Sequence, residues 1–155
     1  MYKYFLFLLL FFFIGCEASE NFIKPIRPEL NTISFDVVEK QLNLNGDIPE
    51  NLKLLLSKWF DEKIKVSGYQ GDVLIEVYDY KEEIISVNEG KRIDNSLFFK
   101  IILNKSSLKK EYIEGSVTSY GTISGDFSLE EFDTLIQNTH VHLVQRLSKK
   151  LSSLD

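Results

Sequence analysis

The chain has 155 residues, of which 44% are hydrophobic and 26% are charged, a length and composition that fit one globular domain plus a processed end. Removing residues 1–15 takes away one of the 18 basic residues, Lys3, and leaves 17 basic against 23 acidic residues, a formal charge of −6. This charge argues against nucleic acid or an anionic membrane surface as partner, because phosphate contacts need clustered Lys and Arg. The single cysteine, Cys16, excludes a disulfide within the chain.

The first fifteen residues predict an export signal. Lys3 supplies a basic start, and residues 4–14 form an unbroken apolar run. A transmembrane helix needs about 20 apolar residues to cross about 30 Å of hydrocarbon, so this run is too short to span a bilayer. We therefore interpret residues 1–15 as a signal peptide.

The apolar run ends in Phe13-Ile14-Gly15-Cys16, which resembles the lipobox of bacterial lipoproteins. In that family a small residue before the Cys permits cleavage, and the Cys thiol takes a diacylglycerol. The resemblance implies cleavage between Gly15 and Cys16 and attachment of acyl chains such as palmitate to Cys16. Glu17 stands where Asp usually signals retention at the inner membrane, which favours the outer membrane. The alternatives are an ordinary secretory signal with an incidental Cys and an uncleaved apolar anchor.

Residues 16–32 predict a flexible tether after the lipidated Cys, and residues 33–155 predict a single periplasmic domain. The tether contains Pro25 and Pro28, mixed charges and no apolar period. The domain opens with alternating apolar and polar residues over 33–38, which predict the first strand.

Residues 48–65 predict an amphipathic helix because their apolar side chains recur at helical spacing. Asp47 is the expected N-cap, and Glu50 three residues later would complete a capping box. Gly68 suits the helix exit, where a positive φ is often needed.

The second half of the chain predicts three strands and a long helix. Residues 72–87, 96–104 and 111–123 alternate as strands do, with turns between them. Ser128 and Glu131 form a capping-box pattern at the start of a helix that runs to residue 152. The order β-α-β-β-β-α predicts an α+β fold, with a four-stranded, mainly antiparallel sheet and both helices packed on one face.

One face of this sheet is rich in tyrosine. If the helices cover Val73 and its neighbours, Tyr78 and Tyr80 lie on the opposite face, and Tyr112 and Tyr120 join them if the register of the last strand allows. Such a face would suit contact with a protein, glycan or lipid. A plain half-exposed sheet explains the same pattern.

Most of the mature chain, from the first predicted strand to the final helix, loosely resembles a family of small uncharacterised envelope lipoproteins of alphaproteobacteria, which carry Trp-x3-Arg-Leu-x3-Gly-x2-Gly before a strand with Asp. Here Lys63 and Ile64 replace the Arg and Leu. The residues that carry the resemblance are Trp59-Phe60-Asp61-Glu62-Lys63-Ile64, Gly68-Tyr69-Gln70-Gly71, Ile75, Val77 and Asp79. The architecture also resembles lipopolysaccharide-assembly lipoproteins and auxiliary lipoproteins of ABC transport systems. The first family has no assigned activity, so the resemblance implies location rather than mechanism.

No catalytic, metal or cofactor site is predicted. His140 and His142 point in different directions from one helix and so cannot share a metal, and His140 is interpreted as a core residue. Of the adjacent carboxylate pairs, Glu82-Glu83, Asp61-Glu62 and Glu130-Glu131, the two on helices are explained by a solvated face or by the dipole of the first turn. Trp59 lies on the apolar stripe of the first helix, so a core role is favoured over a partner contact.

The sequence therefore favours a membrane-anchored periplasmic lipoprotein that acts without catalysis as an accessory or assembly factor of the cell envelope, with a protein partner there. A lipid- or glycan-binding module is the alternative. An unrecognised hydrolase, which would need a site built from His140 or the carboxylates, is a third hypothesis.

Overall fold

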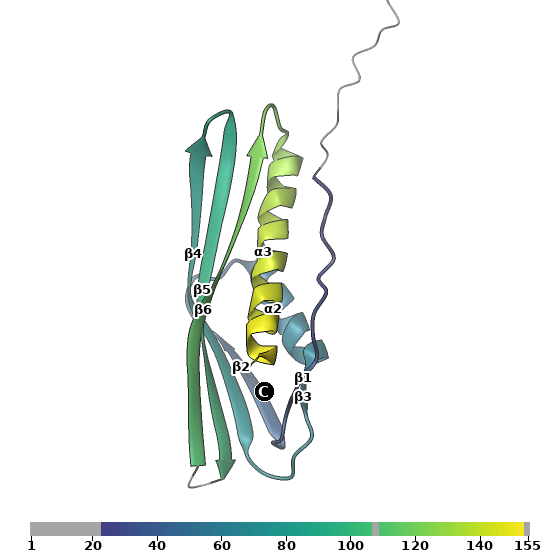
Figure 1. Ribbon diagram of the computed structural model, residues 1–155, viewed down its shortest axis with the longest axis vertical. Coiled ribbons are helices and arrows are strands. Elements are labelled where there is room, and N and C mark those ends of the chain that lie inside the picture. The colour runs from purple at the N-terminus through teal and green to yellow at the C-terminus, as the bar shows by residue number, and fades with distance from the viewer. Residues whose placement is uncertain (1–22, 107–108, 154–155) are drawn as a thin grey trace, which may run out of the picture.

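The computed structural model describes residues 23–106 and 109–153, which form a four-stranded sheet with two helices on one of its faces (Figure 1). The helices are α2 (Glu50–Lys63) and α3 (Leu129–Ser152), and the other face of the sheet is open. The sheet has the order β2-β4-β5-β6, with β2 (Glu39–Leu44), β4 (Asp72–Val87), β5 (Gly90–Ser106) and β6 (Lys109–Ser124). The predicted α+β class, with a mainly antiparallel sheet and both helices on one face, is confirmed.

The segment 33–38, predicted as one strand, contributes to a separate sheet. β1 (Ile33–Phe35) pairs in parallel with β3 (Ile64–Val66), and the chain then bends into β2, which pairs in parallel with β4. β2, α2 and β4 form a crossover, which is the connection that neighbouring parallel strands require. The fourth strand of the main sheet is therefore β2 and not the predicted segment.

The start of α2 differs from the prediction. The helix begins at Glu50 with Pro49 at the N-cap position, which has no side chain that can accept a hydrogen bond, so the predicted capping box of Asp47 and Glu50 is wrong. The chain turns at Gly46, which has a φ of +87°, and then buries Ile48, leaving the exposed Asp47 outside the helix.

The end of α2 is held by a lysine from the neighbouring strand. The Lys40 ammonium donates to the carbonyls of Phe60 at 3.0 Å and of Ile64 at 2.7 Å. The Phe60 carbonyl also accepts the Ile64 N–H, so the ammonium adds a charged donor at the end of the helix, where the helix dipole favours a cation, and ties β2 to α2. Gly68, predicted at the helix exit, follows β3 instead, where a Cβ would lie 2.5 Å from the Asp36 carbonyl carbon.

α3 begins as predicted. The Glu131 N–H donates to Ser128 Oγ at 3.2 Å, and the Ser128 N–H donates to Glu131 Oε2 at 2.7 Å, which completes the capping box. These bonds from Ser128 lower the pKa of the Glu131 carboxyl. The helix lies close to β6 at Gly121, where a Cβ would come 2.8 Å from Leu135 Cδ1.

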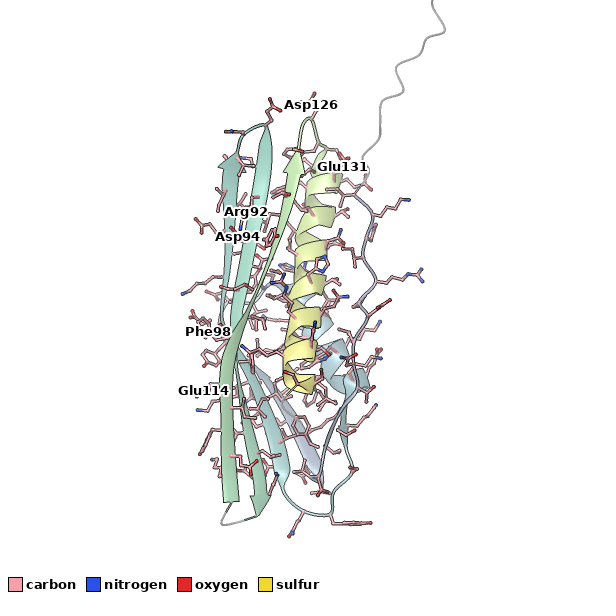
Figure 2. The ribbon with its side chains drawn as sticks, viewed as in Figure 1. Arg92, Asp94, Phe98, Glu114, Asp126 and Glu131 are labelled. Carbon is pink, nitrogen blue, oxygen red and sulfur yellow. The ribbon has the colours of Figure 1, made fainter. Side chains whose placement is uncertain are left out.

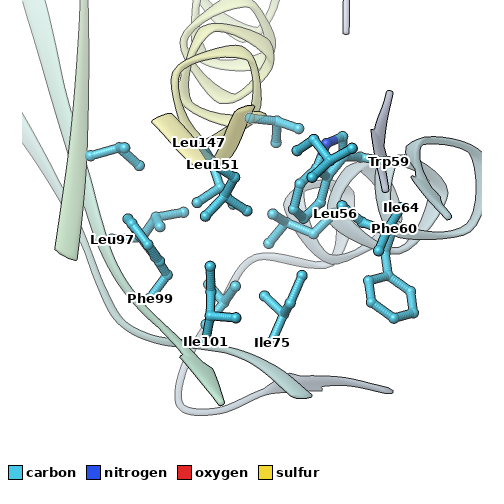
Figure 3. Close-up of a cluster of buried hydrophobic side chains, with 14 of the residues drawn as sticks. Leu56, Trp59, Phe60, Ile64, Ile75, Leu97, Phe99, Ile101, Leu147 and Leu151 are labelled. Carbon is cyan, nitrogen blue, oxygen red and sulfur yellow. The ribbon is translucent and has the colours of Figure 1, made fainter. Parts of the chain in front are cut away.

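The main apolar core fills the space between the sheet and the two helices (Figure 3). Trp59 of α2 and Phe99 of β5 are among its largest fully buried side chains, which confirms the core role expected for Trp59. A smaller second cluster contains Ile93, Ile123 and Leu135, near the start of α3. Both clusters lie on the helix-covered side of the sheet.

Residues 23–32, which we call the strap, are docked along α3 (Figure 1). The buried side chain of Asn138 accepts a hydrogen bond from the Ile26 N–H at 2.9 Å and donates to the Lys24 carbonyl at 2.9 Å. Leu30 packs against the main core, and Ile23 packs against the second cluster. The flexible tether predicted over 16–32 is therefore wrong for 23–32, because one amide side chain and two apolar side chains hold this segment; residues 16–22 lie outside the described residues.

We expect Asn138→Ala to release residues 24–26 of the strap from α3, because the Ile26 N–H and the Lys24 carbonyl both lose their hydrogen-bond partner. The free energy of unfolding should fall by about 1–2 kcal/mol, and the amide of Ile26 should exchange its hydrogen faster than in the unmodified protein. Gln137→Ala, at the exposed neighbouring position, is the control. Unchanged exchange at Ile26 in Asn138→Ala would contradict the docking.

Candidate functional site

The predicted anchor lies before the part of the chain that the structure describes. Gly15 and Cys16 are outside the described residues, so cleavage and lipidation there stay predictions. None of the helices within residues 23–106 and 109–153 is long and apolar enough to cross a membrane.

Three of the four tyrosines predicted as a partner surface lie on the sheet face that the helices leave uncovered, which we call the open face. Tyr78 of β4 stands opposite Phe98 of β5, and their rings stack with centroids 6.1 Å apart. Tyr112 and Tyr120 on β6 expose 55% and 59% of their surface, and Phe98 exposes 38%. The open face therefore presents aromatic side chains from three adjacent strands.

Charged side chains lie beside these rings at the lower end of the open face. Lys100 forms an ion pair with Glu114 at 3.1 Å, and its ammonium lies 5.3 Å from the centre of the Tyr112 ring. The hydrogen bond with Glu114 raises the pKa of Lys100. The cation is thus held in place by both a carboxylate and an aromatic ring.

The upper end of the open face repeats this arrangement. Arg92 forms an ion pair with Asp94 at 2.8 Å, and its guanidinium lies 4.9 Å from the centre of the Tyr120 ring. Figure 2 shows Arg92, Asp94, Phe98 and Glu114 on the side of the sheet away from the helices. A groove of about 360 Å³ lies here, lined by Lys81, Glu83, Arg92, Asp94, Asn95, Ser96, Thr118, Ser119 and Tyr120. Exposed Tyr, Phe and Arg together are the side chains enriched at protein interfaces.

The sequence interpretation missed Phe98 and Arg92. The signal for Phe98 was present, because Leu97, Phe99 and Ile101 alternate as buried residues and place Phe98 on the opposite face. Arg92 lies in the part of β5 that precedes the predicted strand, so its face could not be assigned.

Tyr80 does not belong to the open face, which corrects the prediction. The pairing of β4 with β5 shifts between Tyr78 and Lys81, where β4 contains one extra residue. Asp79 has a φ of +51°, a conformation that Asp tolerates better than most residues, and it marks this bulge. The extra residue rotates Tyr80 to the side of the sheet that α3 covers, where its ring packs edge-on against His140.

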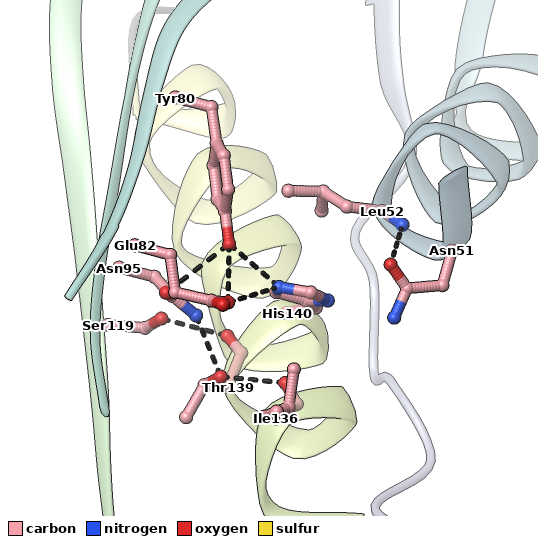
Figure 4. A network of polar contacts seen from close by, with 9 residues as sticks. All are labelled: Asn51, Leu52, Tyr80, Glu82, Asn95, Ser119, Ile136, Thr139 and His140. Carbon is pink, nitrogen blue, oxygen red and sulfur yellow. Dashed lines mark hydrogen bonds and ion pairs between the residues drawn. The ribbon is translucent and has the colours of Figure 1, made fainter. Parts of the chain in front are cut away.

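The rotated tyrosine joins a polar cluster beneath α3, in which Glu82 is exposed and the other members are partly or fully buried (Figure 4). Tyr80 Oη lies 2.8 Å from His140 Nε2 and 2.8 Å from Glu82 Oε2. Asn95 Nδ2 donates to Thr139 Oγ1 at 2.7 Å. His140, Asn95 and Thr139 are each at most 2% exposed.

The cluster separates the two apolar clusters along β5 and α3. On β5, Asn95 stands between Ile93 and Leu97, which belong to different clusters. On α3, the polar pair of Thr139 and His140 follows Leu135 of the second cluster and precedes Leu143 of the main core. Ser119 of β6 also donates to the Thr139 carbonyl at 2.8 Å. These hydrogen bonds therefore fix the position of α3 along the strands. Apolar packing alone is less directional and would fix that position less precisely.

We assign His140 as the neutral Nε2–H tautomer. The Tyr80 O–H can then donate to Glu82, and Nε2–H can donate to Tyr80 Oη or to Glu82 Oε2 at 3.3 Å. Nδ1 is buried and has no hydrogen-bond donor among the described residues. Burial lowers the pKa of His140, against the opposing effect of the Glu82 carboxylate, and burial with the bond to Glu82 raises the pKa of Tyr80.

The free energy of unfolding is expected to fall as the pH drops from 7.5 to 5.5. The unfolded chain protonates His140 near pH 6.5, but the folded chain resists protonation to a lower pH, so protons favour the unfolded state. This residue should account for a loss of up to about 1.4 kcal/mol over that range. Urea unfolding at the two pH values measures it.

Two variants test whether His140 is responsible. His140→Gln should flatten the pH dependence, whereas His142→Gln, at a partly exposed position on the same helix, should leave it unchanged. If the free energy of unfolding changes equally with pH in both variants, groups other than His140 cause the pH dependence.

In this cluster His140 lies buried under α3, and the exposed Glu82 carboxylate is bonded to Tyr80 and lies near His140. Over the described ranges, no group of three or more His, Cys, Asp or Glu residues could hold a metal ion. The open face, with its exposed aromatic rings and the cations held beside them, is the candidate functional site.

No protein-family model and no curated protein matches the chain. Among solved structures, the fold is similar to a minor lipoprotein from Acinetobacter baumannii, with a TM-score of 0.53 and 13% identity, over 76% of this chain and 94% of that one. It is also similar to an uncharacterised lipoprotein B from Nitrosomonas europaea, with a TM-score of 0.51 and 10% identity, over 84% of this chain and 92% of that one.

Both of these neighbours are bacterial lipoproteins. The similarity of folds agrees with the lipoprotein resemblance that the sequence shows, while the narrower alphaproteobacterial family stays a prediction. At identities of 10% and 13%, the similarity shows the fold and does not assign a role.

Proposed function

We propose that the chain is an exported lipoprotein, anchored to the outer membrane by acyl chains on Cys16 and facing the periplasm. Its domain binds another envelope protein and acts as a non-catalytic accessory or assembly factor. The lipobox resemblance of Gly15-Cys16 and the folds of the two lipoprotein neighbours support the anchored location.

The open face is the observation that carries the proposed partner. Phe98, Tyr112 and Tyr120 remain exposed on the face of the sheet opposite the two helices. Arg92 and Lys100 are held over two of these rings, so binding would not have to order long, mobile cations. A protein partner gains apolar contact from the rings and specificity from the fixed charges.

The docked strap limits how far the domain can move from the membrane. Between Cys16 and Ile23 the chain can extend roughly 25 Å, less than half the reach of a free tether that continued to residue 32. Ile23 packs near the start of α3, so that end of the domain would lie toward the bilayer. The open face, which runs along the length of β5 and β6, would then stand beside a membrane-embedded partner.

Site-specific photocrosslinking in intact cells tests this proposal. A photoreactive phenylalanine analogue at Tyr112 or Tyr120 should form a discrete crosslink to one envelope protein. The same analogue at Leu54, which is 65% exposed on α2 and faces away from the sheet, is the control and should not.

Phe98→Glu should reduce the crosslink from Tyr120 by about tenfold or more, because it places a charge in the centre of an aromatic contact. Its melting temperature should fall by only about 2–8 °C, so the domain stays folded, since Phe98 lies outside the core. If the crosslink persists in Phe98→Glu, or if Leu54 crosslinks equally well, the open face is not the partner surface.

A further inference from the structure

A second concave site lies on the other side of the domain, between α2, α3 and the strap. It encloses about 370 Å³ and is remote from the open face, because the helices separate it from the sheet. Its lining divides into an apolar set and a charged set. The apolar residues are Pro28, Leu30, Leu55, Trp59, Val141 and Val144, and the charged residues are Arg27, Lys58, Glu62 and Lys63.

Trp59 forms part of the pocket wall and contains an unsatisfied polar atom. Its Nε1–H is buried and has no acceptor among the residues that the structure describes. In Figure 3 the indole nitrogen lies at the edge of the apolar cluster rather than at its centre. Buried donors without a partner are rare in native proteins, so this N–H marks a position where an acceptor would be favourable.

The charged residues around the pocket are mainly basic, although the chain as a whole is acidic. Glu62 is paired with Lys58 at 4.0 Å along α2. Arg27 on the strap and Lys63 at the end of α2 have no ion pair within the described residues, so two positive charges remain uncompensated beside an apolar pocket. An anionic group at this rim would be attracted by both.

We propose that this pocket binds a single-chain anionic amphiphile, with its hydrocarbon chain along Leu30, Leu55 and Val144 and its anionic head at Arg27 and Lys63. The volume supports one chain rather than two, since it lies near the lower limit of small-molecule sites, about 300–1,000 Å³. The head can be a carboxylate or a phosphate, because both carry the charge that the rim attracts. This site goes beyond the partner surface and does not depend on acylation of Cys16.

The only tryptophan of the chain provides a direct readout. We suggest reconstituting the full chain in uncharged phosphatidylcholine vesicles and titrating it with bromine-tagged undecanoate, because bromine quenches indole fluorescence only near contact. Saturable quenching of Trp59 is expected. A tagged carboxylate two methylenes shorter should bind about 15-fold more weakly, from the loss of apolar burial.

Charge variants separate a specific site from simple partitioning of the probe. Lys63→Glu and Arg27→Glu should each weaken binding about tenfold, while Lys65→Glu, on an exposed position outside the pocket, should leave binding unchanged. Arg27 lies on the exposed strap, so its variant stays informative if Lys63→Glu disturbs the end of α2. Melting temperatures verify that each variant is folded.

Competition identifies the head group. Displacement of the tagged probe by dodecanoate or by dodecyl phosphate supports the site, and the stronger competitor names the head that it prefers. The proposal is overturned if Trp59 is not quenched, if tagged undecanol quenches it as strongly as the carboxylate, or if neither rim variant weakens binding.

Discussion

Alanine in place of Cys16 is expected to abolish labelling of the chain with radioactive palmitate and to leave a precursor that retains residues 1–15. The thiol is the only cysteine sulfur in the chain and follows Gly15 at the end of the apolar run. Without it no thioether to a diacylglycerol can form, and the cleavage that the lipobox resemblance implies does not occur. Two or three acyl chains anchor a protein firmly because each buried CH₂ contributes about 0.8 kcal/mol.

The experiment compares the unmodified chain, Cys16→Ala and Ser19→Ala after metabolic labelling. The control variant changes a nearby small residue and should be labelled and cleaved as the unmodified chain is. Membrane fractions separated by density would then show whether the labelled chain resides in the outer membrane. A mature protein that begins elsewhere than at Cys16, or whose thiol has no added mass, would contradict the anchored location.

Long strands were predictable from the sequence where one face of the sheet is buried, because apolar residues then recur at every second position. β4 runs over Asp72–Val87, the range that the alternation predicts, and the α3 capping box of Ser128 and Glu131 is confirmed. These patterns are local, so no information about distant residues was needed.

The features that the sequence did not reveal depend on contacts between distant segments. Tyr80 changes face because of one extra residue at Asp79, and only the pairing with β5 shows that extra residue. The strap was predicted as free because residues 23–32 have no period of their own; its order comes from Asn138, more than 100 residues away. Neither effect is visible in a window of neighbouring residues.

The candidate site was predictable in part for the same reason. The face on which Tyr78, Tyr112 and Tyr120 lie can be predicted from the alternation of apolar and polar residues, once the helices are assigned to the apolar face. The pairing of Arg92 with Asp94 and of Lys100 with Glu114 required the register of β5 and its length, which the sequence pattern underestimated. The pocket beside Trp59 depends on the docked strap and could not have been anticipated.

Replacing Phe99 by Ala should lower the free energy of unfolding by about 3–5 kcal/mol. Phe99 is fully buried in the main core, and its ring fills the space beside Gly115, where a Cβ would come 2.8 Å from Phe99 Cζ. Truncation removes the apolar burial of the ring and leaves a cavity that the sheet and α3 cannot close completely. Urea unfolding monitored by the fluorescence of Trp59 measures the loss.

The adjacent Phe98→Ala is a matched control because it deletes the same ring from the opposite face of the same strand. Phe98 is 38% exposed and loses mainly its stacking with Tyr78, so the cost should be about 0.5–1.5 kcal/mol. A shift of β5 by one residue would exchange the two faces and reverse the two effects. Similar losses in both variants would mean that both faces of the sheet are buried in the folded chain, and the open face could not then be the partner surface.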